Sequence, residues 1–166
     1  MQLIKRYILI GIIFVLMIGT LSHFVYNLTG NNDFIGFFFP VNESTWEHMK
    51  LIYFPMILYA LFAIPKLKSE YPCITSALLC SILIGTFAIP IIFYTYTGIL
   101  GQNYPALDIA TFAVSVLLAF HSAYKLTVSC KADTQKRFLL FIVLLLGICF
   151  VIFTYHPPNL GLFSEP

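Results

Sequence analysis

The chain has 166 residues, of which 60 % are hydrophobic and 10 % are charged, and its formal net charge is +2. Soluble domains carry about 25 % charged residues, so this composition excludes an ordinary soluble protein. The small net charge, without a basic patch interleaved with aromatic residues, argues against nucleic acid as a partner.

Five apolar runs follow one another along the chain. A transmembrane helix needs about 20 predominantly apolar residues, and each run approaches or exceeds that length. The runs cover residues 7–26, 49–65, 74–96, 106–124 and 138–155. The first is long for a signal peptide and is not followed by a cleavage pattern, so we expect it to be retained. Residues 1–166 are therefore predicted to form a single membrane domain.

The charges divide between the two ends of these runs. Lys and Arg occur before the first run and in the connections at 66–73 and 125–137, with Lys50 as the exception. The positive-inside rule places these basic segments in the cytoplasm. The chain is thus predicted to be an all-α, polytopic membrane helix bundle with five transmembrane helices, its N-terminus inside and its C-terminus outside. Small residues such as Gly11, Gly19 and Gly85 would let its helices approach closely.

The four cysteines do not form a C-x-x-C pair. Without such spacing, the sequence predicts neither a disulfide framework nor a cysteine-based metal site. We expect Cys73, Cys80, Cys130 and Cys149 to be small, buried, apolar residues.

Two segments on the outer side combine polar and apolar residues. Residues 27–45 begin polar and then carry four phenylalanines within 34–39, which a solvated loop would not need. We expect this aromatic segment to lie in the outer interface or to fold over the bundle as a lid. The tail, residues 157–166, also carries apolar side chains and is predicted to cover the same outer end of the bundle.

The densest polar motif is the block PVNESTWEH at residues 40–48, directly before the second run. Ser44 and Glu47 have the spacing of a capping box, so Glu47 is either a helix cap or a site residue. Glu43 and His48 are not explained by this cap. Because Glu47 and His48 are adjacent, their side chains would point about 100° apart on a helix.

Further polar residues are predicted to lie at the same depth. His23 is close to the outer end of the first run, Asp108 to that of the fourth, and His156 follows the fifth. A carboxylate inside a span is costly and usually functional. Histidine and carboxylate ligands suit zinc or another divalent ion with an open position for water. The predicted metal ligands are His23, His48 and His156, and the predicted catalytic acid–base residues are Glu43, Glu47 and Asp108.

Without a metal, the same residues would support a proton relay or acid–base chemistry. His121 is predicted to lie near the cytoplasmic end, where it would be hydrogen-bonded close to the inner interface. A proton path from Asp108 through Ser115 to His121 is the alternative.

The stretches SHFVY at 22–26, PVNESTWEHMK at 40–50 and PPNLGLF at 157–163 resemble a family of small integral membrane proteins of unknown function, found mainly in Gram-positive bacteria. The resemblance covers nearly the whole chain and implies a multi-pass protein of the bacterial cytoplasmic membrane. It lends no catalytic residues, and Gly161 stands where the pattern leads us to expect proline. The outer site is also similar to that of seven-helix intramembrane zinc hydrolases of the alkaline ceramidase type, although this chain has fewer helices and lacks their paired-histidine spacing.

Two functional hypotheses follow. The first is a metal-dependent hydrolase of a lipid or envelope substrate. The second is a non-enzymatic small carrier or accessory subunit whose polar residues serve helix capping and packing. Membrane lipids are the expected partners in both, and a homo-oligomer or a partner membrane protein is compatible with either.

Overall fold

The computed structural model describes residues 2–166, which form helices and connecting turns without any β-strand. The elements are α1 (Gln2–Leu28), α2 (Asp33–Gly36), α3 (Thr45–Leu67), α4 (Ile74–Leu100), α5 (Pro105–Ser129) and α6 (Lys136–Tyr155), with the 3₁₀ turns η1 (Asp133–Gln135) and η2 (Gly161–Phe163). Five of the helices are long and apolar enough to cross a membrane. The predicted all-helical architecture with five such helices is confirmed.

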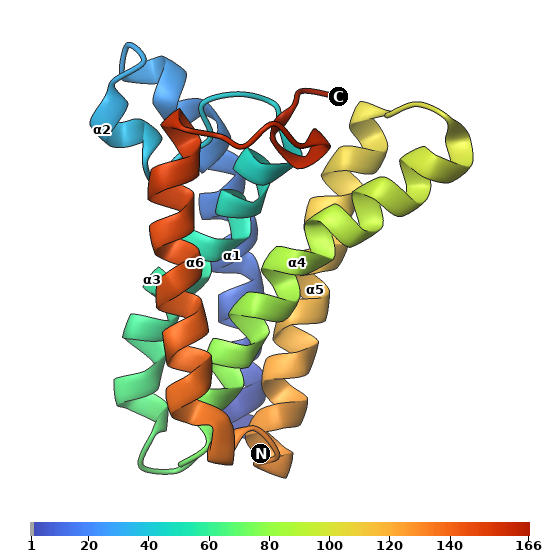
Figure 1. Cartoon of the computed structure of the whole chain (residues 1–166). Coiled ribbons are helices and arrows are strands. Elements are labelled where there is room, and N and C mark those ends of the chain that lie inside the picture. Colours follow the sequence, from blue (N-terminus) through green and yellow to red (C-terminus); the bar gives the residue numbers. More distant parts are fainter. Residues whose placement is uncertain (1) are drawn as a thin grey trace.

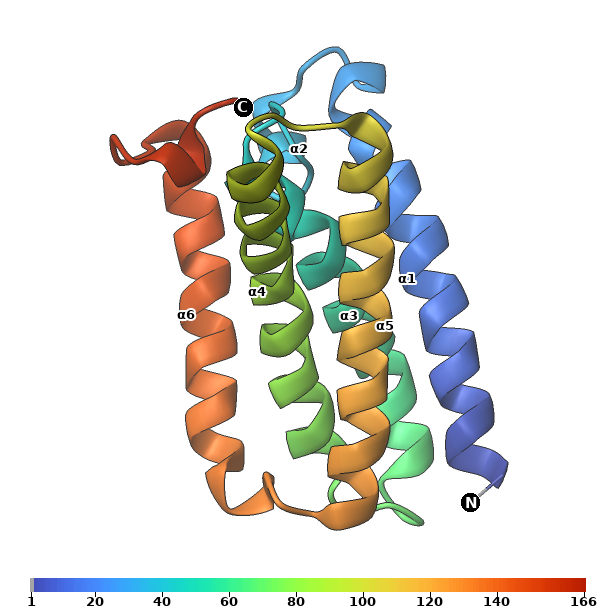
Figure 2. The ribbon, with the colours of Figure 1, turned by 90° about the vertical axis from the view of Figure 1, so that its right-hand side faces the viewer.

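The five long helices lie side by side in a bundle, with α3 and α4 inside and with α1 and α6 on opposite sides (Figures 1 and 2). The core is formed largely by α3, including Met49, Ile52 and Met56, against α4 and α5. By contrast, large apolar side chains of α1 and α6, among them Met17 and Phe141, remain exposed. Contiguous apolar exposure of this kind marks a surface that lipid or another protein covers.

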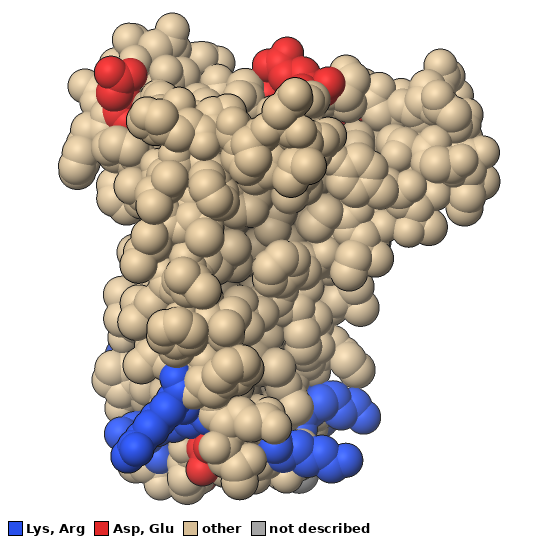
Figure 3. Space-filling view, viewed as in Figure 1, with Lys and Arg blue, Asp and Glu red and all other residues tan. Residues whose placement is uncertain are grey.

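The two ends of the bundle differ in charge (Figure 3). The Lys and Arg side chains lie at the start of α1 and in or next to the α3–α4 and α5–α6 connections, and we call this the basic end. The opposite end, here the acidic end, contains α2, the α4–α5 connection and the chain's last residues (Figure 1). Lys50 is the exception to this separation, and it lies in the second turn of α3 with no exposed side-chain surface.

Small residues let the helices approach, as the sequence predicted. A Cβ atom added to Gly11 of α1 would lie 2.2 Å from Phe120 Cε1 of α5, and one added to Gly85 of α4 would lie 2.7 Å from the Ala119 Cβ. Real side chains do not come so close, so these glycines are needed where the helices cross.

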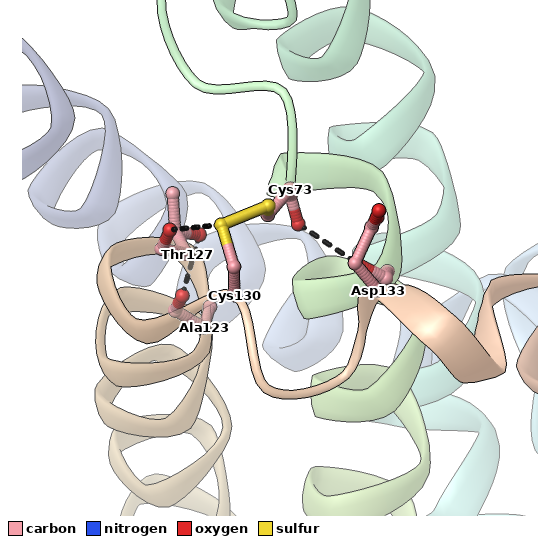
Figure 4. The surroundings of a disulfide bond; sticks show 6 residues. Cys73, Ala123, Thr127, Cys130 and Asp133 are labelled. Atoms are coloured by element: carbon pink, nitrogen blue, oxygen red, sulfur yellow. Dashed lines mark hydrogen bonds between the residues drawn. A yellow bond between two sulfur atoms is a disulfide. The ribbon is translucent and has the colours of Figure 1, made fainter.

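A disulfide joins Cys73 before α4 to Cys130 after α5 at the basic end (Figure 4). The two Cα atoms are 5.3 Å apart, although 57 positions separate them in the sequence. The prediction of no disulfide is therefore wrong. It relied on short-range spacing, whereas the antiparallel packing of α4 and α5 brings the two positions together. Cys80 and Cys149 remain as free, half-buried thiols.

Candidate metal-binding site at the acidic end

Three side chains from separate segments meet at the acidic end. His23 lies in the last turns of α1, Glu43 in the loop before α3, and His48 in the first turn of α3. The Glu43 Oε2 atom is 3.4 Å from His23 Nε2 and 3.4 Å from His48 Nε2. One potential ligand atom of each residue lies within 4.8 Å of the others. We call these three residues the His–Glu–His cluster.

The first turn of α3 determines the direction of His48. Ser44 caps the helix by accepting a hydrogen bond from the Glu47 backbone N–H at 3.4 Å, and its carbonyl oxygen lies 3.0 Å from His48 Nδ1. Because a carbonyl oxygen can only accept, the ring must donate through Nδ1–H, which leaves Nε2 facing Glu43. Metal-binding histidines usually donate their other ring N–H to a carbonyl or carboxylate in this way.

The spacing of the cluster suits a small divalent ion. In tetrahedral zinc sites the bonds to nitrogen and oxygen are about 2.1 Å, so neighbouring ligand atoms are about 3.4 Å apart. Both histidine–carboxylate separations in the cluster equal 3.4 Å. Two imidazoles and one carboxylate are also the ligand set of many zinc hydrolases, in which water takes the fourth position.

The cluster faces a cavity of about 650 Å³ between α1, α3, α4, α5 and the tail. The carboxylate side chains that line this cavity belong to Glu43, Asp108 and Glu165. Asp108 accepts a hydrogen bond from the Tyr96 hydroxyl of α4, which orients its side chain. Most of the remaining lining is apolar and includes Phe24, Leu51, Ile89, Phe93, Ile109 and Phe112. The cavity therefore combines a candidate metal site with an extended apolar surface.

Glu47 belongs to a different part of the structure. Its side chain is 2 % exposed, and its Oε2 atom lies 2.7 Å from Lys50 Nζ and accepts from the Val41 backbone N–H at 3.0 Å. Lys50 also donates to the Gly36 carbonyl at 2.9 Å and to Thr154 Oγ1 at 2.6 Å. This buried network ties α3 to α6 and to the segment before α3.

The buried network explains why Lys50 departs from the charge pattern. A lysine among the apolar residues of a predicted span, such as Lys50, indicates that a partner of opposite charge lies nearby within the helix bundle. The i, i+3 spacing of Glu47 and Lys50 would have suggested the pair, but Thr154 is 104 residues away from Lys50 in the sequence. Glu47 and His48 do point in different directions, so only His48 reaches the cavity.

His156 does not join the His–Glu–His cluster. It is exposed at the end of α6, which packs against α4 on the far side of the bundle from α1 (Figure 2). His23 projects from α1, so the two histidines are separated by the inner helices. Glu43, assigned from the sequence as an acid–base residue, is the third member of the cluster instead.

The aromatic segment 34–39 also lies away from the cavity. Phe37 packs on Tyr155 of α6, and Phe38 packs on Phe54 of α3, with ring centroids 5.3 and 5.4 Å apart. None of residues 34–39 lines the cavity, whereas Glu165 of the tail does. The expectation that the aromatic segment covers the site is corrected: among the described residues, the tail and not this segment borders the cavity.

The proposed proton path to His121 also lacks support in the structure. Ser115 is buried in the bundle, whereas His121 lies on the exposed face of α5.

The fold and the cluster together define an all-helical chain with five helices long and apolar enough to span a membrane and a candidate metal-binding triad. The chain belongs to DUF6512, a family of unknown function, whose sequence profile matches residues 1–166. This confirms the broad part of the resemblance, namely membership in a family without an assigned function. No curated protein and no solved structure matches the chain.

Proposed function

We propose that the protein is a metal-dependent hydrolase of the bacterial cytoplasmic membrane that acts on a lipid or envelope substrate at the outer face. The observation that carries this proposal is the His–Glu–His cluster at the edge of a largely apolar cavity. The metal is divalent, and zinc fits the ligand set and the spacing.

The membrane location and the orientation are supported by two features. Five helices have the length and composition of spans, and the outward sides of α1 and α6 are apolar. Under the positive-inside rule the basic end would face the cytoplasm, which supports an outer location for the cluster. A lipid could then reach the cavity without leaving the bilayer.

In the proposed reaction, His23, Glu43 and His48 would hold the ion, which would supply a bound water molecule with a lowered pKa. Asp108, which lines the same cavity, accepts a proton from that water. The resulting hydroxide would attack the carbonyl carbon of an ester or amide, and the ion would supply positive charge for the oxygen that becomes negative. The bond to the leaving oxygen or nitrogen then breaks, and the proton on Asp108 moves to that atom. One water and one substrate thus give one acid and one alcohol or amine.

The metal content of the purified protein tests the first step. We expect near-stoichiometric zinc or another divalent ion in the wild type after metal-replete expression, and its loss in His48→Ala and in Glu43→Gln. His156→Ala and His121→Ala are matched controls, because both side chains are exposed and lie outside the cluster. Elemental mass spectrometry of monodisperse protein measures the outcome.

Absence of metal from the wild type would reject the metal-dependent hydrolase. Equal metal loss in His156→Ala would show that the ligand set is not the His–Glu–His cluster. Circular dichroism on each variant separates loss of metal from loss of the fold.

A non-enzymatic accessory or carrier role is the second candidate. The observation that favours it is the Glu47–Lys50–Thr154 network, in which conspicuous polar residues join helices and do not face the cavity. This candidate predicts that Asp108→Asn changes coupled uptake or partner binding, whereas metal content has no effect on function.

A further inference from the structure

The cavity beside the His–Glu–His cluster has the volume of a small-molecule site, since ligand pockets usually occupy about 300 to 1,000 Å³. Its volume is about 650 Å³, and its apolar residues come from α1, α3, α4 and α5. A purely polar solute would leave this apolar surface without a partner. An elongated apolar group such as an acyl chain would cover it.

Two residues that line the cavity, on the neighbouring helices α1 and α5, are also exposed. Phe24 of α1 and Ile109 of α5 both line it, and they are 55 % and 70 % exposed. These helices lie next to each other in Figure 2. If these two side chains face lipid, an acyl chain can enter sideways between Phe24 and Ile109 while its polar group remains at the acidic end.

The charge of the lining selects among lipids. Glu43, Asp108 and Glu165 contribute carboxylates, and the lining contains no Lys or Arg among residues 2–166. A divalent ion on the cluster neutralises two of these three negative charges and leaves one. Nearby, Lys50 is bound to Glu47 and buried, so it offers no charge to the cavity. An anionic phosphate in the cavity would therefore meet repulsion instead of the Lys or Arg contacts that phosphate sites use.

We propose that the cavity takes an acyl ester or amide with an uncharged polar headgroup and discriminates against anionic phospholipids. This inference rests on the proposed hydrolase function for its chemistry, but its lipid selectivity concerns binding and is measured separately. In this arrangement the acyl chain would lie toward Phe24 and Ile109, the carbonyl near the His–Glu–His cluster, and the headgroup near Asn103 and Glu165, which also line the cavity.

Two lipids that share one acyl ester, one with an uncharged headgroup and one with an anionic headgroup, provide the test. These are a monoacylglycerol and the corresponding lysophosphatidylglycerol, each also prepared as a tritiated ether analogue that cannot be hydrolysed. Binding of the ether analogues to zinc-loaded wild type in neutral detergent measures selectivity, and release of fatty acid from the esters measures hydrolysis. We expect the neutral analogue to bind roughly tenfold more tightly than the anionic one, because the phosphate of the anionic analogue would be repelled by the one net negative charge of the cavity.

Glu165→Lys tests the cause of the selectivity. Glu165 is exposed, and inverting its charge removes the net negative balance of the metal-loaded cavity. Because the substitution changes the charge of the metal-loaded lining from one negative to one positive, we expect this variant to lose the preference for the neutral analogue and to bind the anionic analogue at least as tightly. Glu70→Lys makes the same charge change at an exposed position of the basic end and should leave the preference intact.

Equal or tighter binding of the anionic ether analogue by the wild type would overturn the inference. An unchanged preference in Glu165→Lys would also overturn it, because the selectivity would not come from the charge of the cavity. If the neutral analogue binds selectively but neither ester is hydrolysed, the proposed hydrolase function fails and the lipid selectivity stands. Hydrolysis of both esters at equal rates, without selective binding, would leave the hydrolase and reject the selectivity.

Discussion

The buried Glu47–Lys50 pair makes a sharp prediction about Glu47→Gln. The two side chains are 2 % and 0 % exposed, and their charged atoms lie 2.7 Å apart. Glutamine keeps the size of Glu47 but leaves the ammonium group of Lys50 without a counter-charge. Breaking a buried ion pair by removing one partner costs about 3–5 kcal/mol. For a chain of this length that loss corresponds to a fall in Tm of roughly 6 to 20 °C.

Thermal unfolding of the protein in detergent, followed by fluorescence-detected size exclusion, measures the change. With any bound metal first removed by chelation, Glu43→Gln is the matched control, because the same substitution four residues earlier affects a side chain that is 61 % exposed. We expect its unfolding free energy to change by less than about 0.5 kcal/mol. The double variant Glu47→Gln with Lys50→Met should recover part of the loss, since no unpaired charge is then buried.

An unchanged Tm for Glu47→Gln would refute this assignment. It would mean that Glu47 does not hold Lys50 in the folded protein and would return Glu47 to the candidate acid–base residues. A loss of equal size in Glu43→Gln would also count against the reasoning, because burial would then not explain the difference.

Three further predictions concern the cluster, the helix packing and the disulfide. Metal affinity should fall as pH is lowered from about 8 to about 5, because imidazole and carboxylate ligands must be deprotonated to bind; titration with a fluorescent zinc competitor measures this. Gly11→Ala should lower the unfolding free energy by about 1–3 kcal/mol, because its Cβ would lie 2.2 Å from a ring carbon of Phe120. Gly98→Ala is the control and should not destabilise the protein, because no atom lies within 4 Å of the added Cβ. Replacing both Cys73 and Cys130 by serine should cost about 4 kcal/mol in the chain-entropy view for a separation of 57 residues, as measured by thermal unfolding.

Each of these has an outcome that contradicts it. Metal affinity that does not change with pH would exclude histidine ligands. Equal stability of the two glycine variants would mean that α1 does not approach α5 as closely as described. Alkylation of all four cysteines in unreduced, denatured protein would show that the disulfide is absent.

Much of the architecture could be predicted from local features of the sequence. Apolar runs of sufficient length predict helices that can span a membrane, since a lipid environment requires every backbone group to bond within its own segment. The Ser44 cap was likewise predictable, because the capping oxygen and the Glu47 N–H that it accepts from are only three residues apart. These features depend on neighbours in the chain, so composition and spacing are sufficient to identify them.

The makeup of the candidate site depended on how the helices pack. The sequence indicated that Glu47 and His48 diverge, but only the rotation of α3 against α1 and α6 decided that His48 reaches His23 and that Glu47 reaches Lys50. The position of α6 across the bundle likewise separated His156 from His23.

The sequence by itself determined the helices, their apolar faces and the separation of charge between the two ends, because each follows from the chemistry of adjacent residues. Only the tertiary structure decided the His–Glu–His cluster, the Lys50–Thr154 contact and the Cys73–Cys130 bond. These join residues far apart in the chain, and a helix turns about 100° per residue, so small differences in helix rotation decide which side chains meet.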